Sequence, residues 1–199
     1  MKRIKVLVVL LLIVLTLSSC DRVRGSSDVV VNPVMEAYCG VYLNADMKKN
    51  LSVDRDIVIV PYRETVKDFY NRVGADNVEV TDSQGNKVSD DILLSTGFLV
   101  NTEYYNFYVA VLGDVDGDGR IMKSDSTLAE KYYLGEEKAP ALPYVVAADV
   151  DLSGKVDMTD VGLIELGLSS SSQPLGWYYE AMAMPVIDVS YEECSLVMN

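Results

Sequence analysis

Acidic residues recur at a fixed spacing around a glycine in two separate stretches of the chain, and this repeat limits the fold more than any other feature. The first copy lies in "GDVDGDGRIMKSD", residues 113–125, and the second in "ADVDLSGKVDMTD", residues 148–160. Like charges crowded into one turn repel one another, so either water solvates all of them or a cation lies between them. Two solvated acidic turns would not need a shared register. The repeat therefore favours two cation-binding loops of the same kind.

Both stretches match a calcium-binding loop of the pattern D-x-[DN]-x-[DN]-G. Calcium prefers six to eight oxygen ligands, and such a loop supplies them from positions 1, 3, 5, 7, 9 and 12. The first loop offers the carboxylates of Asp114, Asp116, Asp118 and Asp125 and the backbone carbonyl of Arg120. The second loop offers the side chains of Asp149, Asp151, Ser153, Asp157 and Asp160 and the backbone carbonyl of Lys155. Met122 stands at position 9 of the first loop, so we expect water to complete that site. The sequence thus predicts two Ca²⁺ sites.

Helices are expected only after the loops, over residues 126–135 and 161–168. A strand-like segment precedes the first loop, and Pro140 and Pro143 disfavour a regular helix before the second. Gly162 and Gly167 weaken the second helix, because each interior glycine costs about 1 kcal/mol relative to alanine. The sequence therefore predicts two loop–helix half-motifs rather than complete helix–loop–helix units.

Residues 29–112 read as a small α+β module, Ig-like or β-grasp-like. The run 56–62 is rich in β-branched residues and predicts a strand, and 104–113 predicts a second. Between them, 65–74 has the signature of a capped helix, with Thr65 three residues before Asp68 and a glycine at the end. We expect strands covered on one face by this helix.

Aromatic side chains cluster near the second strand and offer two interpretations. Tyr104, Tyr105, Phe107 and Tyr108, together with Tyr62, have the composition of a sugar-stacking platform. Strand alternation instead places Phe107 and Tyr105 in the core, with Tyr104 and Tyr108 on the other face. We favour the second interpretation.

The first twenty residues predict export and lipid anchoring. Lys2, Arg3 and Lys5 precede an apolar run that is shorter than the ~20 residues needed to span a bilayer. The segment ends in Leu-Ser-Ser-Cys, which is similar to the lipobox of bacterial lipoproteins, so Cys20 is the expected lipidation site. Residues 21–28 read as a tether. The expected location is the outer face of a bacterial cell membrane.

Charge and composition exclude several functions. Loss of the three basic residues with the signal peptide changes the formal charge from −13 to −16, which disfavours nucleic-acid partners. The chain has no histidine, so His-based triads and most catalytic zinc sites are excluded. Cys39 and Cys194 remain after export, and their spacing leaves a disulfide and two free thiols equally open.

The two acidic stretches closely resemble a type I dockerin, whose repeats read roughly "GDVNGDGxIxxxD" and "ADVxxxGxVxxxD". The resemblance covers residues 113–168, and the segment before it also resembles a module found directly before bacterial dockerins. It implies calcium-dependent folding and binding of a cohesin domain in assemblies that degrade plant polysaccharides. By the same resemblance, the partner contacts would come from Lys123, Ser124, Lys131, Met158 and Thr159. The two repeats differ at these positions, so we expect the first repeat to supply the main contact face.

The sequence therefore predicts an α+β chain with a dockerin domain over 113–170. The tail, 171–199, is too apolar for a disordered segment and is expected to pack back on the chain. A non-enzymatic docking lipoprotein is the leading hypothesis. A carbohydrate-binding or adhesive surface protein with structural calcium loops and a small polysaccharide hydrolase remain the alternatives.

Overall fold

A five-stranded mixed sheet with the order β1–β2–β5–β4–β3 forms the centre of the molecule. The computed structural model describes residues 45–74 and 77–169, together with Val34, Tyr38, Gly40, Val41 and Leu43. The central strands β2 (Asp56–Val60) and β5 (Asn106–Val111) are parallel, and the other pairings are antiparallel. The outer strands are β1 (Gly40–Val41), β3 (Val78–Thr81) and β4 (Leu99–Thr102). Both central strands lie inside the segments expected to be strands.

Several expectations fall outside the described residues. They concern the signal segment 1–20 with Cys20, the tether 21–28, a pairing of Cys39 with Cys194, and the tail 171–199. Within the described part, no helix combines the length and apolarity needed to cross a membrane.

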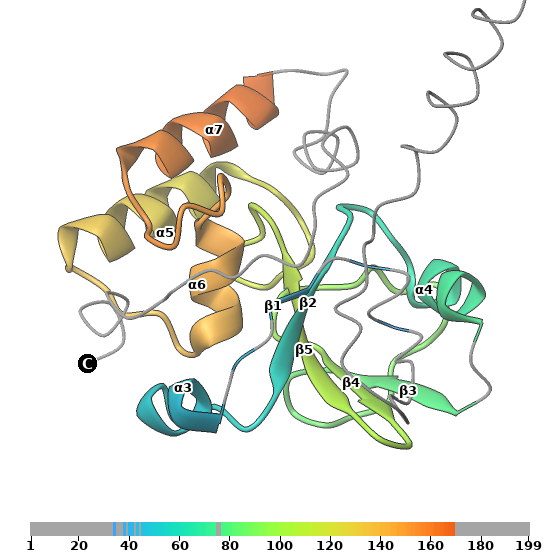
Figure 1. Cartoon of the computed structure of the whole chain (residues 1–199). Helices are drawn as coiled ribbons and strands as arrows, with labels where there is room; N and C mark the ends of the chain where they lie inside the picture. Colours follow the sequence, from blue (N-terminus) through green and yellow to red (C-terminus); the bar gives the residue numbers. More distant parts are fainter. Residues whose placement is uncertain are drawn as a thin grey trace, which may run out of the picture.

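Both faces of the sheet are covered, which explains why β2 is apolar and buried from Ile57 to Val60, after Asp56 at its start. Ile57 and Ile59 point to one face and Val58 and Val60 to the other, as strand geometry requires. Figure 1 shows α4 (Val66–Val73) on one side of the central strands and α6 (Leu142–Ala148) on the other. The expected helix therefore covers one face, and helices from the C-terminal half cover the second.

Helix α4 begins and ends where its sequence predicts. Oγ1 of Thr65 accepts a 3.1 Å hydrogen bond from the Asp68 N–H, and Oδ2 of Asp68 accepts a 3.2 Å bond from the Thr65 N–H. Gly74 ends the helix in the left-handed conformation with φ of 62°. The helix predicted over 65–74 is confirmed, because its limits depend on local residues alone.

The aromatic residues near β5 follow strand alternation only inside the strand. Phe107 is fully buried and Tyr108 packs against the opposite face. Tyr105 precedes the strand and is 38% exposed, so the expectation that it lies in the core is wrong. Tyr104 is also exposed. Because Phe107 is buried, the five aromatic rings do not form one exposed platform.

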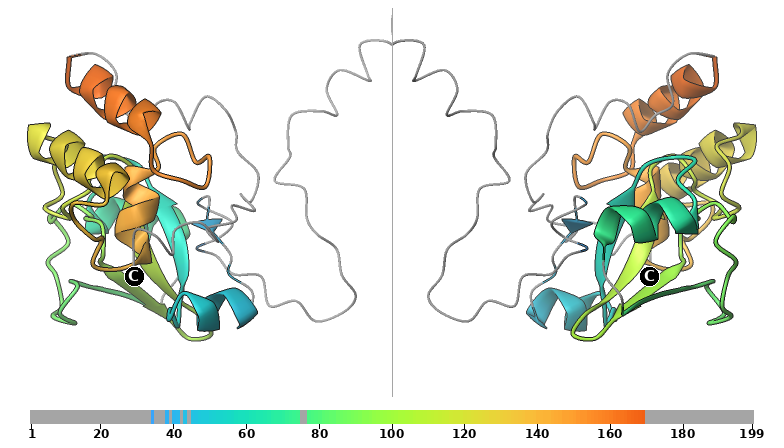
Figure 2. Two further views of the ribbon diagram at one scale, coloured as in Figure 1. Left: turned by 90° about the vertical axis from the view of Figure 1, so that its left-hand side faces the viewer. Right: turned by 90° about the vertical axis from the view of Figure 1, so that its right-hand side faces the viewer.

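Residues 113–169, the described part of the C-terminal half, contain three helices where two were expected. Helices α5 (Lys123–Leu134) and α7 (Met158–Ser169) each begin three residues before the predicted starts and lie side by side (Figures 1 and 2). The prediction that no helix precedes the second loop is wrong. Pro143 lies in the first turn of α6, where its missing N–H breaks no helical hydrogen bond. The second repeat is therefore helix–loop–helix, whereas strand β5 leads into the first.

One hydrophobic core joins the two halves of the chain. Ile57, Ile59 and Ala110 of the sheet belong to the same buried cluster as Leu142 and Val146 of α6. A second cluster lies between α4 and the opposite face of the sheet. The remaining helix, α3 (Ala45–Asn50), precedes β2. The fold is of the α+β class, as predicted.

Candidate metal centres in the two acidic loops

The first acidic loop gathers three carboxylates after the end of β5. One oxygen each of Asp114, Asp116 and Asp118 lies within 4.8 Å of the others. Oδ1 of Asp116 accepts a 3.1 Å bond from the Asp118 N–H, and Oδ1 of Asp118 accepts a 2.8 Å bond from the Arg120 N–H. The loop turns at Gly119, whose φ is 79°. These contacts fold positions 1, 3 and 5 around one point.

Asp125, at position 12, lies buried in the first turn of α5. Its Oδ1 accepts bonds from the N–H groups of Val115 and Asp116 at 2.7 and 3.1 Å, and its Oδ2 accepts a 2.7 Å bond from the Met122 N–H. It is not part of the group of three carboxylates. The side chain thus closes the loop by tying its start to the start of the helix.

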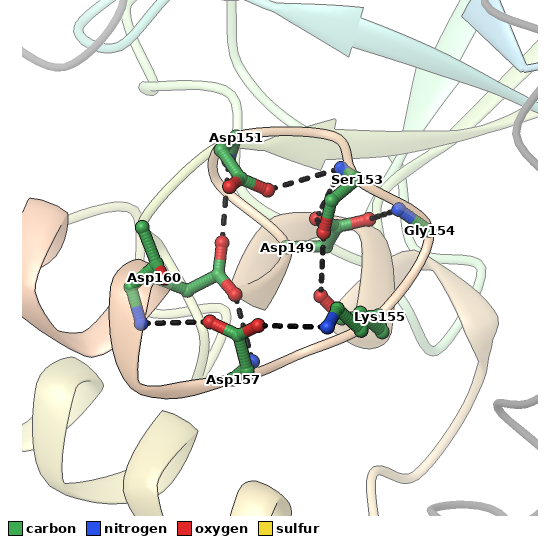
Figure 3. A network of polar contacts seen from close by, with 8 residues as sticks. Asp149, Asp151, Ser153, Gly154, Lys155, Asp157 and Asp160 are labelled. Carbon is green, nitrogen blue, oxygen red and sulfur yellow. Dashed lines mark hydrogen bonds and ion pairs between the residues drawn. The ribbon is translucent and has the colours of Figure 1, made fainter.

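The second loop, drawn in Figure 3, also gathers three carboxylates, but here the group includes position 12 in place of position 5. One oxygen each of Asp149, Asp151 and Asp160 lies within 4.8 Å of the others. Oδ1 of Asp160 accepts a 3.2 Å bond from the Asp151 N–H, and Oδ2 accepts a 2.8 Å bond from the Asp157 N–H. In both loops, therefore, the backbone N–H groups of positions 3 and 9 donate hydrogen bonds to the carboxylate at position 12. Equivalent backbone bonds mean that the two loops share a structure as well as a spacing.

The other predicted ligands of the second loop, Ser153, Lys155 and Asp157, lie outside the group of three carboxylates. The Ser153 hydroxyl donates a 3.3 Å bond to the carbonyl of Lys155, which places both oxygens on the same side of the loop. Asp157 lies outside the group of three carboxylates, and its Oδ2 is 3.2 Å from Nζ of Lys155. Its Oδ1 accepts a 2.7 Å bond from the Thr159 N–H. Arg120 and Lys155 both expose their side chains at position 7.

Burial makes the first carboxylate of each loop costly to ionise. Asp114 and Asp149 are fully buried, and this burial raises the pKa of each to about 7, although backbone N–H donors act in the opposite direction. Burial also raises the pKa of Asp125 and Asp160. A neighbouring cation favours the ionised form and offsets this cost. The donor sets contain oxygen only, so they fit a hard cation such as Ca²⁺.

Two apolar side chains fix the loops to the core. Ile121 and Val156 stand at position 8 of their loops, and each is only 8% exposed. Both belong to the cluster that includes Leu142 of α6. The two acidic loops are therefore anchored in one hydrophobic cluster. Separation of the loops would expose Ile121 and Val156 to solvent.

The residues expected to contact a partner are all exposed on or beside α5 and α7. These are Lys123, Ser124, Lys131, Met158 and Thr159. Nζ of Lys123 forms an ion pair with Glu165, and Nζ of Lys131 lies 3.0 Å from Oε2 of Glu137. Helices α5 and α7 run in opposite directions (Figure 1). The pair at the start of α5 and the pair at the start of α7 therefore lie at opposite ends of the two-helix surface.

One contact of the first loop comes from Thr96, a residue that no sequence pattern indicates. The Thr96 N–H donates a 2.8 Å hydrogen bond to Oδ2 of Asp114. Thr96 lies before β4, in a stretch without charge or a metal-binding pattern. A backbone donor leaves no signature in a sequence, so only the folded structure reveals it.

The fold and the paired loops define a domain of two acidic-loop repeats packed on a small sheet. Residues 112–166 match the family model of the dockerin type I domain. This part of the chain is a dockerin type I domain. Dockerin domains in general bind calcium and dock non-catalytically onto cohesin domains, and proteins that carry them are typically extracellular. No curated protein and no solved structure matches the chain.

Proposed function

We propose that this chain is a cell-surface lipoprotein that docks a cohesin-bearing protein in a cellulosome-like, polysaccharide-degrading assembly. Two Ca²⁺ ions would fold and hold the docking surface. The observation that carries the proposal is the repeated bonding of position 12 to positions 3 and 9 in both loops. The predicted ligands are those of the sequence analysis, with Asp114 and Asp149 at position 1.

The membrane anchor in this proposal is Cys20. The support is the basic start, the apolar run and the Leu-Ser-Ser-Cys ending of the first twenty residues. More than one lipid chain on one protein makes anchoring stable. A dockerin held at the membrane would recruit a soluble cohesin-bearing partner to the cell surface.

The partner surface we propose lies on α5 and α7, with its main contacts in the first repeat. Lys123 and Ser124 begin α5, and Lys131 lies on the same helix. The corresponding pair of the second repeat is Met158 and Thr159, so the two ends of the surface differ in charge. This difference disfavours two equivalent, rotated modes of binding.

A docking role agrees with how the acidic residues are used. Most of the acid clusters of the chain lie in the two loops, where their backbone bonds tie them to the dockerin fold. Glycoside hydrolysis needs two carboxyl groups that flank a sugar. Polysaccharide hydrolysis that disappears with a change of one upstream Asp or Glu would revive the hydrolase alternative. Sugar binding that survives removal of residues 113–170 would support the adhesive alternative.

The test is a pull-down from surface extract with residues 21–199 as bait, in calcium and in EDTA, with mass spectrometry of retained proteins. The control bait carries Asp116→Asn and Asp151→Asn, because these side chains are less buried than Asp114 and Asp149 and their amides keep the size of the carboxylates. We expect a cohesin-bearing protein on the parent bait in calcium only. Calorimetry should give two calcium ions per chain. Specific retention that is equal in EDTA, or no specific retention in calcium, would contradict the docking proposal.

A further inference from the structure

The two loops hold their first carboxylate in different ways. Asp149 accepts both of its short backbone bonds from its own loop, from the N–H groups of Ser153 and Gly154, each at 2.9 Å. Asp114 accepts one bond from its own loop, from the Gly119 N–H at 3.1 Å, and one from Thr96 at 2.8 Å. Thr96 lies outside the segment that matches the dockerin family. The first loop is therefore completed by the upstream part of the chain, whereas the second is self-contained.

Thr96 is fixed by the sheet. It is only 1% exposed, and its Oγ1 accepts a 3.1 Å bond from the Val111 N–H and donates a 3.3 Å bond to the Val111 carbonyl. The next residue, Gly97, donates its N–H to the carbonyl of Val109 at 2.9 Å. Both partners lie on β5, the central strand. The position of the Thr96 N–H therefore depends on a folded sheet.

The upstream loop 93–97 also packs directly against the first acidic loop. A Cβ added to Gly119 would lie 2.6 Å from Oγ of Ser95, and one added to Gly117 would lie 2.7 Å from the carbonyl of Thr96. Both glycines have positive φ, so the acidic loop needs them for its turn and for this approach. The space beside each glycine is thus too small for a methyl group, which leaves the two loops little room to move independently.

We infer that Thr96 is a positioning residue for the first calcium loop and that Ca²⁺ binding there is coupled to folding of the upstream sheet. This inference rests on the proposed calcium binding of the loops. A carboxylate that binds a cation through one oxygen can accept a hydrogen bond at the other, so the Thr96 N–H restricts Asp114 without competing for that ligand atom. Coupling is reciprocal. The folded sheet raises the calcium affinity of the first loop, and calcium in that loop stabilises the sheet.

The first test measures calcium affinity of each loop in residues 21–199 by calorimetry. The double substitution Asp151→Asn, Asp157→Asn removes two predicted ligands of the second loop, so that calcium binding to the first loop is measured alone. The double substitution Asp116→Asn, Asp118→Asn does the same to the first loop, so that the second is measured alone. Into each background we place Thr96→Val, which removes the bonds to Val111 and keeps the side-chain shape. We expect the first loop to lose about three- to tenfold in affinity and the second to change less than about twofold.

The matched control is Thr81→Val in the same two backgrounds. Thr81 is a buried threonine of β3 whose Oγ1 has no hydrogen-bond partner in the described part of the molecule. Equal losses from Thr96→Val and Thr81→Val, or equal losses in both loops, would overturn the coupling and indicate general destabilisation. If neither loop binds calcium in the parent chain, the proposed function itself fails.

A second test leaves the upstream loop unchanged, so it does not depend on the folding of a Thr96 variant. Amide hydrogen exchange is measured with calcium added to each background. Calcium in the first loop should slow exchange of the Thr96 amide and of β4 and β5, and calcium in the second loop should slow them less. A Thr96 amide that exchanges equally fast with and without calcium in the first loop overturns the inference.

Discussion

Lys123 and Glu165 form an ion pair that joins the first turn of α5 to α7. Both side chains are largely exposed, so the pair contributes little to folding, since exposed ion pairs typically contribute between ~0 and ~1 kcal/mol. Its position is more informative than its strength. The pair lies at the end of the two-helix surface where Lys123 and Ser124 are expected to contact a partner.

Lys123→Ala should therefore separate stability from binding. We expect the free energy of unfolding to change by less than about 0.5 kcal/mol and the affinity for the proposed cohesin partner to fall clearly. Met158→Ala, at the opposite end of the surface, is the matched variant and should weaken binding less. Denaturation in calcium gives the stability, and surface plasmon resonance with the captured partner gives the affinity. Equal losses from the two variants would indicate that both repeats contribute equally.

The shared core predicts that the sheet and the helices unfold together. Leu142 on α6 is fully buried in the cluster that contains Ile57 and Ala110 of the sheet. Leu142→Ala should lower the free energy of unfolding by about 2–5 kcal/mol, because it leaves a cavity between the two halves. Native-state hydrogen exchange in calcium should show reduced protection of the amides of β2 and β5 as well as those of α5.

Leu166→Ala is the control for this prediction, because Leu166 is 63% exposed on α7. Its effect on stability should stay within about 0.5 kcal/mol. Loss of protection confined to the helices in the Leu142→Ala variant would show that the two halves fold independently.

The sequence predicts best the features that depend on neighbours along the chain. Thr65, Asp68 and Gly74 define α4 because capping is a contact between residues three or four positions apart. The acidic loops are predictable because position 12 bonds to the backbone of positions 3 and 9 within the same twelve-residue loop. Local spacing thus carries the information for both the helix and the candidate sites.

Local sequence patterns do not predict features that depend on residues distant along the chain. Pro143 suggested a break, but the apolar side chains of α6 are buried against the sheet, and the proline lies in the first turn where a helix tolerates it. The bond from Thr96 to Asp114 joins segments separated by two strands, and it involves a backbone donor that every non-proline residue carries. No pattern of side chains could have indicated it.

Gly162 offers a test of the free-energy cost that an interior glycine imposes on α7. It lies inside the helix, and a Cβ added there would meet no atom within 4 Å. Gly162→Ala should therefore raise the free energy of unfolding by about 1 kcal/mol. Gly97→Ala is the contrasting variant, because Gly97 has φ of 90° and its Cβ would lie 2.4 Å from Oη of Tyr144. We expect Gly97→Ala to destabilise, and chemical denaturation in calcium measures both.

Glu64 provides a prediction for pH. The residue is 5% exposed, and its Oε1 accepts bonds from the Tyr38 hydroxyl at 2.8 Å and from Nε of Arg72 at 2.9 Å. Oε2 is buried with no hydrogen-bond partner in the described part of the chain. Burial raises the pKa of Glu64 above its ordinary value of 4.5, although Tyr38 and Arg72 lower it. Folding therefore shifts the Glu64 equilibrium towards the uncharged carboxyl, relative to the unfolded chain.

Because the pKa of Glu64 is higher in the folded state, its contribution to stability is fully present below pH 4.5 and is lost as pH rises through the raised value. The free energy of unfolding of the parent minus that of Glu64→Gln should therefore fall with rising pH and then level off. Asp68→Asn should show the opposite sign, because hydrogen bonds from Thr65 lower the pKa of Asp68. Urea denaturation of the three proteins from pH 4 to pH 8 measures both differences. A Glu64 difference that rises with pH would show that the ion pair with Arg72 outweighs burial.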